Sequence, residues 1–286
     1  LARYIDWSFF FMAWEMDGKY PEVLDHPEKG EEARILLRDA RAMLARMGRE
    51  RLVEARGVLG LLPAAAEEDD TVVVYRDEDR RETLLRIPFL LQQRRKTEVP
   101  YYLSLADYVA PAGSGLSDWI GFFAVTAGIG LEDVVRKFEA AGDDYGAIMV
   151  KVLSDRLAEA FAEYIHLLAR RDHWGYAPDE NLPVEDLLRV RYRGIRPAPG
   201  YPPCPDHRDK LLIWKLLEPD SRAGIRLTES CMMTPEASVS GYIFSHPEAK
   251  YFSVDKLARD QVEDYARRKG DTLAVAEKWL RPMLGY

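Results

Sequence analysis

The stretch from Arg196 to His207 holds the residues best suited to ligand chemistry. It contains five prolines in twelve residues. Each proline fixes its own φ, removes a backbone N–H and favours an extended residue before it, so the stretch should be stiff and should lose little entropy on binding. Arg196 offers a planar fork suited to a carboxylate or phosphate, and Gly200 lets the backbone turn or approach a ligand before Tyr201. On composition alone, a rigid surface turn fits as well as a binding loop.

Cys204 and His207 have the spacing of half a zinc site. A four-coordinate structural site needs a second close pair of ligands. The other histidines are scattered, and the second cysteine, Cys231, is distant in the sequence. We therefore expect no metal in this chain, and we favour His207 as a cap for a helix over residues 209–217.

Two further sequence signals have simple structural interpretations. Asp6 fits the N-cap of a helix that begins at Trp7. Glu159 and Glu163 lie one helical turn apart, and such a pair is typical of a solvated face, with Arg156 as an i,i+3 partner.

A glycine-containing segment at residues 127–130 follows a predicted buried strand at residues 119–126. It lacks the G-x-G-x-x-G spacing and the Gly-Lys-Ser/Thr of a phosphate-binding loop. The sequence therefore gives no support to a dinucleotide or nucleoside triphosphate site.

The composition restricts the class of protein. Apolar residues make up 47% and charged residues 31% of the 286 positions, as in a soluble globular chain, and a net charge of −8 argues against general nucleic-acid binding. Two cysteines fit a reducing, cytoplasmic compartment, and no apolar run is long enough to cross a bilayer. The first residues have neither a signal-peptide pattern nor an initiating methionine, so we expect a part of a longer chain.

Periodicity predicts which segments are helices and strands. Helices are expected over residues 31–51, 145–170 (the longest), 209–217, 259–268 and 273–280, and strands over 57–63, 71–76, 83–87, 119–126, 224–233, 238–246 and 250–254. Because helices and strands are segregated rather than alternating, the pattern favours an α+β fold over a doubly wound sheet.

The proline-rich stretch, with Gly194 and Ile195 before it and Asp209 and Lys210 after it, resembles the signature loop of a known family. That family is the S-adenosylmethionine-binding activation domain of cobalamin-dependent methionine synthase. Other similar segments lie along the whole chain: Tyr4-Ile5-Asp6-Trp7, Asp155 to Tyr164, Trp174-Gly175-Tyr176-Ala177-Pro178, Ala237-Ser238-Val239-Ser240-Gly241 and Arg259 to Ala266. The resemblance implies a single C-shaped α+β domain over residues 1–286, with a bent, twisted antiparallel sheet and the ligand in its concave face.

The resemblance also implies a set of cofactor-binding residues without a catalytic acid or base. Arg196 would hold the ligand carboxylate and Asp6 its ammonium group, while Tyr251 and Phe252 match an aromatic pair near the adenine or sulfonium. At the second position of this pair we expect Tyr from the family pattern, so Phe252 loses any hydroxyl contact. The backbone of Ala198 would accept from the adenine amino group. Glu159 is a site residue of second rank, and Gly200 lets the backbone approach the ligand closely. Tyr201 matches a family tyrosine that faces cobalamin.

The function that the resemblance implies is reductive reactivation of the enzyme. The full enzyme moves a methyl group from methyltetrahydrofolate to homocysteine through cobalamin, and the oxidised cob(II)alamin regains activity with an electron and a methyl group from S-adenosylmethionine. The expected partners are the cobalamin-binding domain of the same enzyme and flavodoxin or a flavoprotein reductase. Zinc and cobalamin would belong to other domains, since the sequence has neither a Cys/His cluster nor an Asp-x-His-x-x-Gly loop. The alternatives are an autonomous methyltransferase and a reductase-docking module without a ligand.

Overall fold

The computed structural model describes residues 1–93 and 101–286. The helices are α1 (Trp7–Ala13), α2 (Gly30–Glu50), α3 (Leu131–Ala140), α4 (Asp144–Leu168), α5 (Val184–Leu188), α6 (Asp209–Leu217), α7 (Pro219–Ala223), α8 (Arg259–Lys269) and α9 (Leu273–Leu280). The strands are β1 (Glu54–Ala66), β2 (Thr71–Tyr75), β3 (Thr83–Pro88), β4 (Asp118–Ile129), β5 (Arg226–Leu227), β6 (Met233–Thr234) and β7 (Ser238–Ile243).

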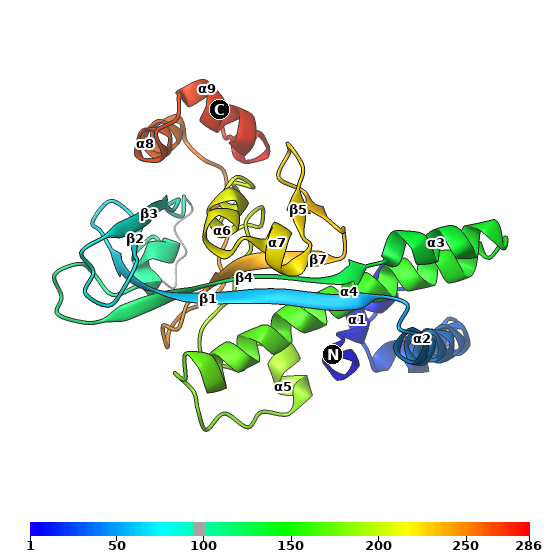
Figure 1. The fold of residues 1–286 in the computed structure, drawn as a ribbon. Helices are drawn as coiled ribbons and strands as arrows, with labels where there is room; N and C mark the ends of the chain where they lie inside the picture. The colour runs from blue at the N-terminus through cyan, green and yellow to red at the C-terminus, as the bar shows by residue number, and fades with distance from the viewer. Residues whose placement is uncertain (94–100) are drawn as a thin grey trace.

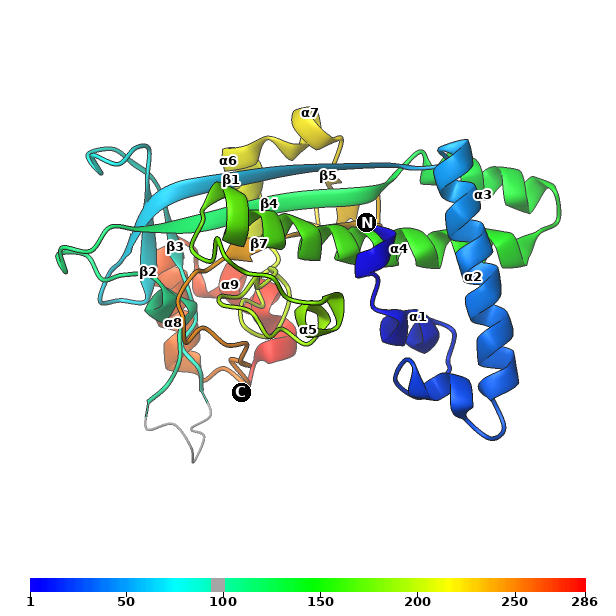
Figure 2. The same cartoon turned by 90° about the horizontal axis from the view of Figure 1, so that it is seen from below.

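The main sheet is antiparallel and has the strand order β3-β2-β1-β4-β7. The long strands β1 and β4 pair from Glu54 opposite Ile129 to Ala64 opposite Asp118 and form the spine of the molecule (Figure 1). Strands β2 and β3 extend only the C-terminal end of β1, where Ala64 pairs with Val74. The parts at the two ends of the spine turn toward the same side, which gives the molecule its C shape (Figure 2).

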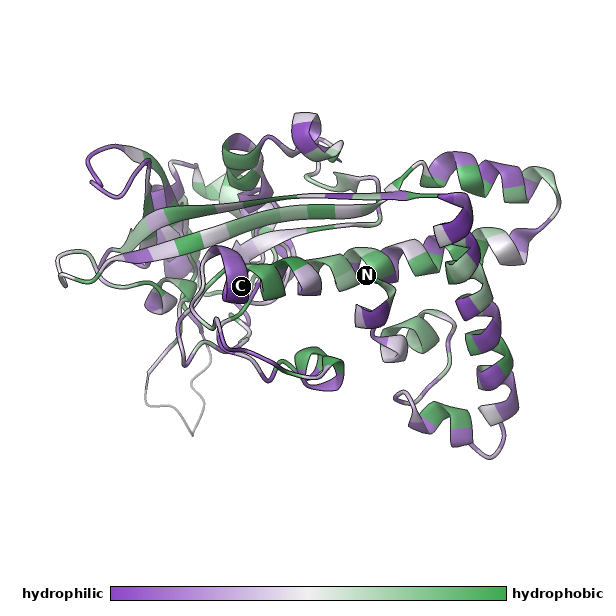
Figure 3. Cartoon of the chain, turned by 60° about the horizontal axis from the view of Figure 1, so that its bottom comes forward, coloured by the Kyte–Doolittle hydropathy of each residue, from purple (hydrophilic) through white to green (hydrophobic). Residues whose placement is uncertain are grey.

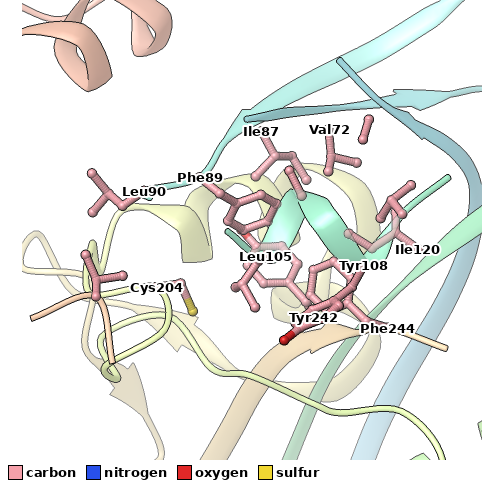
Figure 4. Close-up of a cluster of buried hydrophobic side chains, with 14 of the residues drawn as sticks. Val72, Ile87, Phe89, Leu90, Leu105, Tyr108, Ile120, Cys204, Tyr242 and Phe244 are labelled. Carbon is pink, nitrogen blue, oxygen red and sulfur yellow. The ribbon is translucent and has the colours of Figure 1, made fainter. Parts of the chain in front are cut away.

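Strand β4 is buried on both faces of the sheet. Ile120 and Phe122 belong to a core shared with α6, α8 and strands β2 and β3, drawn in Figure 4. The alternate residues Phe123 and Val125 pack on the other face against α4. Side chains of a strand alternate between faces, and a strand covered on both sides is therefore largely apolar, as residues 119–125 are.

The N-terminal part of the chain packs a second core around helices α1, α2, α3 and α4. Phe10 and Phe11 of α1 are fully buried there, and α2 contributes its apolar stripe, including Leu36, Leu37 and Ala40. Figure 3 shows this stripe along α2, with hydrophilic residues on the other side. This core fixes the start of α1, and thereby Asp6, against α4.

Two of the predicted strands are wrong. Residues 224–233 form only the short hairpin of β5 and β6, because the chain turns between them, with Cys231 in the left-handed region and its N–H bonded to the Thr228 carbonyl. Residues 250–254 form no ladder with the sheet. They run beside the proline-rich stretch instead, where the N–H of Val254 donates to the carbonyl of Pro202 at 3.0 Å. The other predicted strands and helices are confirmed: α6 and α9 have the predicted bounds, and the rest have shifted ends.

The predicted cap at His207 is also wrong. Helix α6 begins after Arg208, and no side chain caps it. The carboxylate of Asp206 accepts from the N–H of Arg208 at 2.9 Å, while Nδ1 of His207 lies 2.7 Å from Nζ of Lys210. Because Asp206 is also bound by Arg208 and Lys269 side chains, its carboxylate fixes the turn that His207 was expected to fix.

Candidate ligand-binding site

A cleft of about 780 Å³ lies between α4, the start of α1 and the proline-rich stretch. Seven of the eight residues predicted for the site line it: Asp6, Glu159, Arg196, Ala198, Tyr201, Tyr251 and Phe252. Phe123 of β4 and Val239 of β7 also line it, next to these residues. The eighth residue, Gly200, lines a neighbouring hollow of about 590 Å³. The fold thus brings together residues from the two ends of the chain.

Asp6 serves as the N-cap of α1, as the local sequence predicted. Its Oδ1 accepts from the N–H of Ser8 at 2.9 Å. This is the hydrogen bond that the structure gives to Asp6, so one carboxylate oxygen keeps its capacity to accept from a ligand. The cap and the cleft position are compatible, because capping uses only one of the two oxygens.

Arg196 is held in place by hydrogen bonds of its backbone neighbours. Ile195 and Phe244 exchange backbone hydrogen bonds of 3.0 Å, and the carbonyl of Pro197 accepts from Tyr242 N–H at 2.9 Å. The residues that flank Arg196 therefore extend the edge of β7 by one short strand-like contact. The guanidinium of Arg196 reaches from this edge to Glu163 of α4.

Glu163 of α4 pairs with Arg196. Its Oε2 lies 2.8 Å from Nη1 of Arg196, and its side chain is only 3% exposed. Burial alone would lower the pKa of Arg196, but the carboxylate of Glu163 raises it, so the guanidinium stays charged. The prediction of a solvated face on α4 is therefore wrong for Glu163.

Arg170 and Glu180 form a second buried ion pair behind the first. Nε and Nη2 of Arg170 donate to both carboxylate oxygens of Glu180 at 2.8–3.1 Å. The guanidinium carbon of Arg170 lies 3.9 Å from the ring centre of Tyr192, whose hydroxyl accepts from Arg196. His166 lies edge-on to the same ring, and burial, with the two arginines, lowers the pKa of His166 far enough to keep it neutral.

Tyr251 and Phe252 differ in their environments. The hydroxyl of Tyr251 accepts from the backbone N–H of Arg196 at 3.0 Å, and its residue is 43% exposed. Phe252 is 5% exposed and packs edge-to-face on Tyr108 in the core. The Tyr251 ring can therefore cover a ligand, whereas Phe252 exposes little of its surface to the cleft.

The proline-rich stretch presents Ala198 and Tyr201 to the cleft. The carbonyl of Ala198 already accepts from the N–H of Tyr201 at 3.2 Å and from the Cys204 thiol at 3.1 Å, which uses both lone pairs. Tyr201 is 59% exposed and lines both the cleft and the neighbouring hollow. At Gly200, φ is +97°, and a Cβ would lie 2.2 Å from Cε1 of His207. The glycine is needed for the turn and for this close approach.

Glu163 lines the cleft and Tyr192 bonds Arg196, and the sequence analysis assigned neither of them to the site. A signal for Glu163 exists, because it lies three residues after the apolar Ala160 in the predicted helix, and residues at that spacing share a helix face. Tyr192 lies in an irregular segment without periodicity. Nothing in its sequence context distinguishes it from an ordinary loop tyrosine.

Metal-binding clusters and membrane-spanning helices are both absent from residues 1–93 and 101–286. In these ranges no group of three or more His, Cys, Asp or Glu side chains comes together in a way that could hold a metal ion. Over the same ranges, no helix is long and apolar enough to cross a membrane.

Comparison with known proteins identifies the family. The family model described as the activation domain of vitamin B12 dependent methionine synthase matches residues 1–270. The chain belongs to this family. A solved structure described as the MetH reactivation domain bound to AdoHcy (S-adenosylhomocysteine) is similar over 100% of this chain and 87% of that chain, at 52% sequence identity and a TM-score of 0.95.

This activation domain is therefore part of cobalamin-dependent methionine synthase, a methyltransferase. The α+β fold that the sequence predicted is confirmed, with a five-stranded antiparallel sheet flanked by helices. Four of the segments on which the resemblance was based supply walls of the cleft: the start of the chain up to α1, helix α4, the proline-rich stretch and the segment of β7 that contains Val239.

Proposed function

We propose that this activation domain binds S-adenosylmethionine in the cleft and presents its methyl group to cobalamin for reductive reactivation of the enzyme. The observation that carries the proposal is the placement of Asp6 and Arg196, of opposite charge, in one cleft beside the ring of Tyr251. The AdoHcy bound to the similar MetH reactivation domain supports it, because this molecule is S-adenosylmethionine without the transferable methyl group.

The ligand's charges match those of the cleft. Two arginines and three carboxylates line it: Arg156, Arg196, Asp6, Glu159 and Glu163. S-Adenosylmethionine has one negative and two positive charges at neutral pH, so the complex has no net charge among these groups. A buried or half-buried charge is costly unless it is paired, and this balance therefore favours the sulfonium ligand.

Each predicted residue has a specific role in the proposed complex. Arg196 donates to the carboxylate through the guanidinium edge that Glu163 leaves free, and Asp6 accepts from the ammonium group. Tyr251 packs on the adenine or near the sulfonium. The N–H of Ala198 is a better adenine contact than its carbonyl, which already accepts two hydrogen bonds. Glu159 adds negative charge near the sulfonium.

The proposed partners are another domain of the same enzyme and a separate electron-donor protein. Tyr201, exposed at the rim of the cleft, faces the cobalamin-binding domain in this proposal, and flavodoxin or a flavoprotein reductase supplies the electron. Residues 1–286 act as one domain of a multidomain enzyme, whose zinc and cobalamin are bound elsewhere. The chemistry of methyl acceptance belongs to cobalamin, while this domain binds and orients the donor.

Calorimetry tests the proposal directly. S-Adenosylmethionine should bind one-to-one, with an unchanged constant in excess chelator. Arg196→Ala should cost about 2–4 kcal/mol of binding free energy, as expected when a desolvated charge pair loses one partner. Arg259→Ala is the matched control, since Arg259 is an exposed arginine of α8 that pairs with Glu263 and does not line the cleft. No heat or spectral change at millimolar ligand would leave the reductase-docking module as the remaining hypothesis.

An autonomous methyltransferase is the alternative of another class. The usual methyltransferase of that kind binds its ligand at a glycine-rich loop of a parallel, alternating α/β sheet. Here the five-stranded sheet is antiparallel, and the cleft is lined by an arginine and prolines instead of such a loop. The geometry therefore favours a domain that positions a methyl donor.

A further inference from the structure

We infer that Glu163 is a positioning residue, which fixes the guanidinium of Arg196 so that only its Nε–Nη2 edge faces the ligand carboxylate. The inference rests on the proposed function. It adds a specific cause for the carboxylate recognition, and it can fail while S-adenosylmethionine binding stands.

The inner end of the Arg196 guanidinium contacts two partners, Glu163 and Tyr192. Nη1 of Arg196 has two N–H groups. Nη1 forms an ion pair with Oε2 of Glu163 at 2.8 Å and also donates a hydrogen bond to the hydroxyl of Tyr192. That hydroxyl lies 3.4 Å from the same carboxylate oxygen, so the three groups form a closed triangle.

The opposite edge of the guanidinium is free. Nε and Nη2 of Arg196 have no hydrogen-bond partner among residues 1–93 and 101–286. They are also not among the unpaired polar atoms that are fully buried in these ranges, so they remain accessible. The side chain is 18% exposed and lines the cleft. A carboxylate can bind two parallel N–H groups of such an edge. This leaves one recognition edge, with a direction that Glu163 sets.

Arg170 does not compete for Glu163, because it has a closer partner. The contact of Glu163 with Arg170 is 3.9 Å long, whereas Arg170 donates three hydrogen bonds to Glu180. The two arginines and two glutamates balance in charge, and each arginine has one close carboxylate. Glu163 is thus the partner of Arg196, and Glu180 that of Arg170.

Loss of Glu163 should release Arg196 rather than merely weaken the fold. Glu159 lines the same cleft and contributes to the negative potential at Arg196. Without the carboxylate of Glu163, the guanidinium has a competing partner across the cleft and no fixed inner contact. It would then spend less time in the orientation that receives a ligand carboxylate.

The test compares two ligands that differ only in that carboxylate: S-adenosylmethionine and its decarboxylated form. Calorimetry on the whole 286-residue chain should give wild-type protein a preference of about 10- to 100-fold for the carboxylated ligand. Arg196→Ala should abolish this preference. Glu163→Ala should reduce it to within about threefold of Arg196→Ala. Glu163→Gln, which keeps an acceptor oxygen but removes the charge, should lie between wild type and Glu163→Ala.

Glu180→Gln is the matched control, because it weakens a buried arginine pair of the same network without contacting Arg196. It should lower the unfolding temperature and leave the ligand preference at the wild-type value. A structural role for Glu163 would move the unfolding temperature only. Should Glu163→Ala not fold, Glu163→Gln alone tests the inference.

The outcomes separate the two proposals. A wild-type preference in folded Glu163→Ala and Glu163→Gln, together with its loss in Arg196→Ala, overturns the role of Glu163 while the proposed function stands. Equal binding of the two ligands by wild-type protein also overturns it, because Arg196 then recognises no carboxylate. Absence of S-adenosylmethionine binding overturns the proposed function itself.

Discussion

The backbone N–H of Arg196 donates a 3.0 Å hydrogen bond to the hydroxyl of Tyr251. The two residues lie on the proline-rich stretch and on the segment that runs beside it, and both line the cleft. Burial raises the pKa of Tyr251, so its hydroxyl stays protonated at neutral pH and still has a proton to donate. One side chain thus contributes both a ring in the cleft wall and a hydrogen bond to the backbone of Arg196.

Tyr251→Phe tests this double role. The variant keeps the ring but leaves the Arg196 N–H without its acceptor, so we expect S-adenosylmethionine binding to weaken by about 0.5–1.5 kcal/mol, the usual size of one hydrogen bond. Calorimetry measures the loss. Tyr286→Phe is the control, because it removes the hydroxyl of an exposed tyrosine that donates to Glu277, and neither residue lines the cleft. This variant should bind S-adenosylmethionine as wild type does. A larger loss in Tyr286→Phe than in Tyr251→Phe would contradict the argument.

Gly200→Ala should disturb the proline-rich stretch. The substitution adds a Cβ at 2.2 Å from the ring of His207, at a φ of +97° that L residues rarely adopt. We expect a loss of about 1–3 kcal/mol in the free energy of unfolding, measured in urea, and weaker S-adenosylmethionine binding.

Two variants separate strain from contact at Gly200. At Gly113, φ is +78° and an added Cβ would meet no heavy atom within 4 Å. Gly113→Ala should therefore lower the free energy of unfolding only through the unfavourable backbone conformation, by about 1 kcal/mol. His207→Ala in the Gly200→Ala background removes the ring and should restore part of the stability. Equal losses for Gly200→Ala and Gly113→Ala would mean that the His207 ring moves away freely.

Much of the fold could be predicted because its long elements have strong periodic patterns. Residues 145–170 have apolar residues at helical spacing and form α4, which continues to His173 as a π-helical turn. Residues 119–126 form the centre of β4, whose neighbours cover both faces. The strand predictions for residues 224–233 and 250–254 were wrong because their local patterns were not sufficient. Strand-like composition was present, but the pairing partner is set by tertiary contacts that a local pattern does not contain.

The candidate site divides in the same way. Asp6, Arg196 and Tyr251 were predicted from a resemblance, and the fold places them in one cleft, while their roles as ligand contacts stay predictions. Glu163 was assigned to a solvated face because a Glu pair one turn apart usually is solvated. Its burial depends on Arg196, which lies far along the chain on another element, and a helix pattern cannot contain that information.

A buried charge cluster under the proline-rich stretch predicts a pH dependence of stability. Asp206 and Asp209 both contact Nζ of Lys269, at 2.8 and 2.5 Å. Burial raises the pKa of Asp209 from 3.8 to about 6, against the attraction of Lys269. Burial also opposes the charge of Asp206, but Lys269 and Arg208 outweigh it and lower its pKa to about 2.

Asp209→Asn tests this cluster. Between pH 3.8 and about 6 the native state holds a proton on Asp209 that the unfolded state has released, so this group makes the free energy of unfolding fall as pH rises through that window. The Asn variant lacks this contribution. Its stability relative to wild type should therefore rise by about 2–3 kcal/mol from about pH 4 to about pH 7, as measured by urea unfolding. The exposed-site control Asp133→Asn should follow the wild-type pH profile. A constant difference for Asp209→Asn would mean that Asp209 is ionised throughout.

The isolated chain should bind S-adenosylmethionine without turning it over. Charged and aromatic side chains line its cleft. Among residues 1–93 and 101–286, no cluster of His, Cys, Asp or Glu could hold a metal ion that activates homocysteine. We expect no labelled methyl transfer to homocysteine by this chain alone. With a cobalamin-binding domain and a reductant added, methylcobalamin should form, which its visible absorbance reports. Robust methylation of an acceptor without cobalamin would replace the proposed function with an autonomous methyltransferase.

Tyr201→Ala should separate methyl transfer from ligand binding in that reconstituted assay. Tyr201 is 59% exposed at the rim shared by the cleft and the neighbouring hollow, and the structure gives its hydroxyl no hydrogen bond within residues 1–93 and 101–286. Its removal therefore costs the ligand site little, and we expect S-adenosylmethionine affinity to change by less than about threefold, or about 0.7 kcal/mol. Methylcobalamin formation should fall by about tenfold or more, because the variant removes the ring that we propose contacts the cobalamin-binding domain. Tyr251→Phe provides the opposite pattern, since its weaker binding should be overcome by saturating ligand. If Tyr201→Ala loses binding and transfer in equal proportion, Tyr201 belongs to the ligand site, and its assignment to the cobalamin face is wrong.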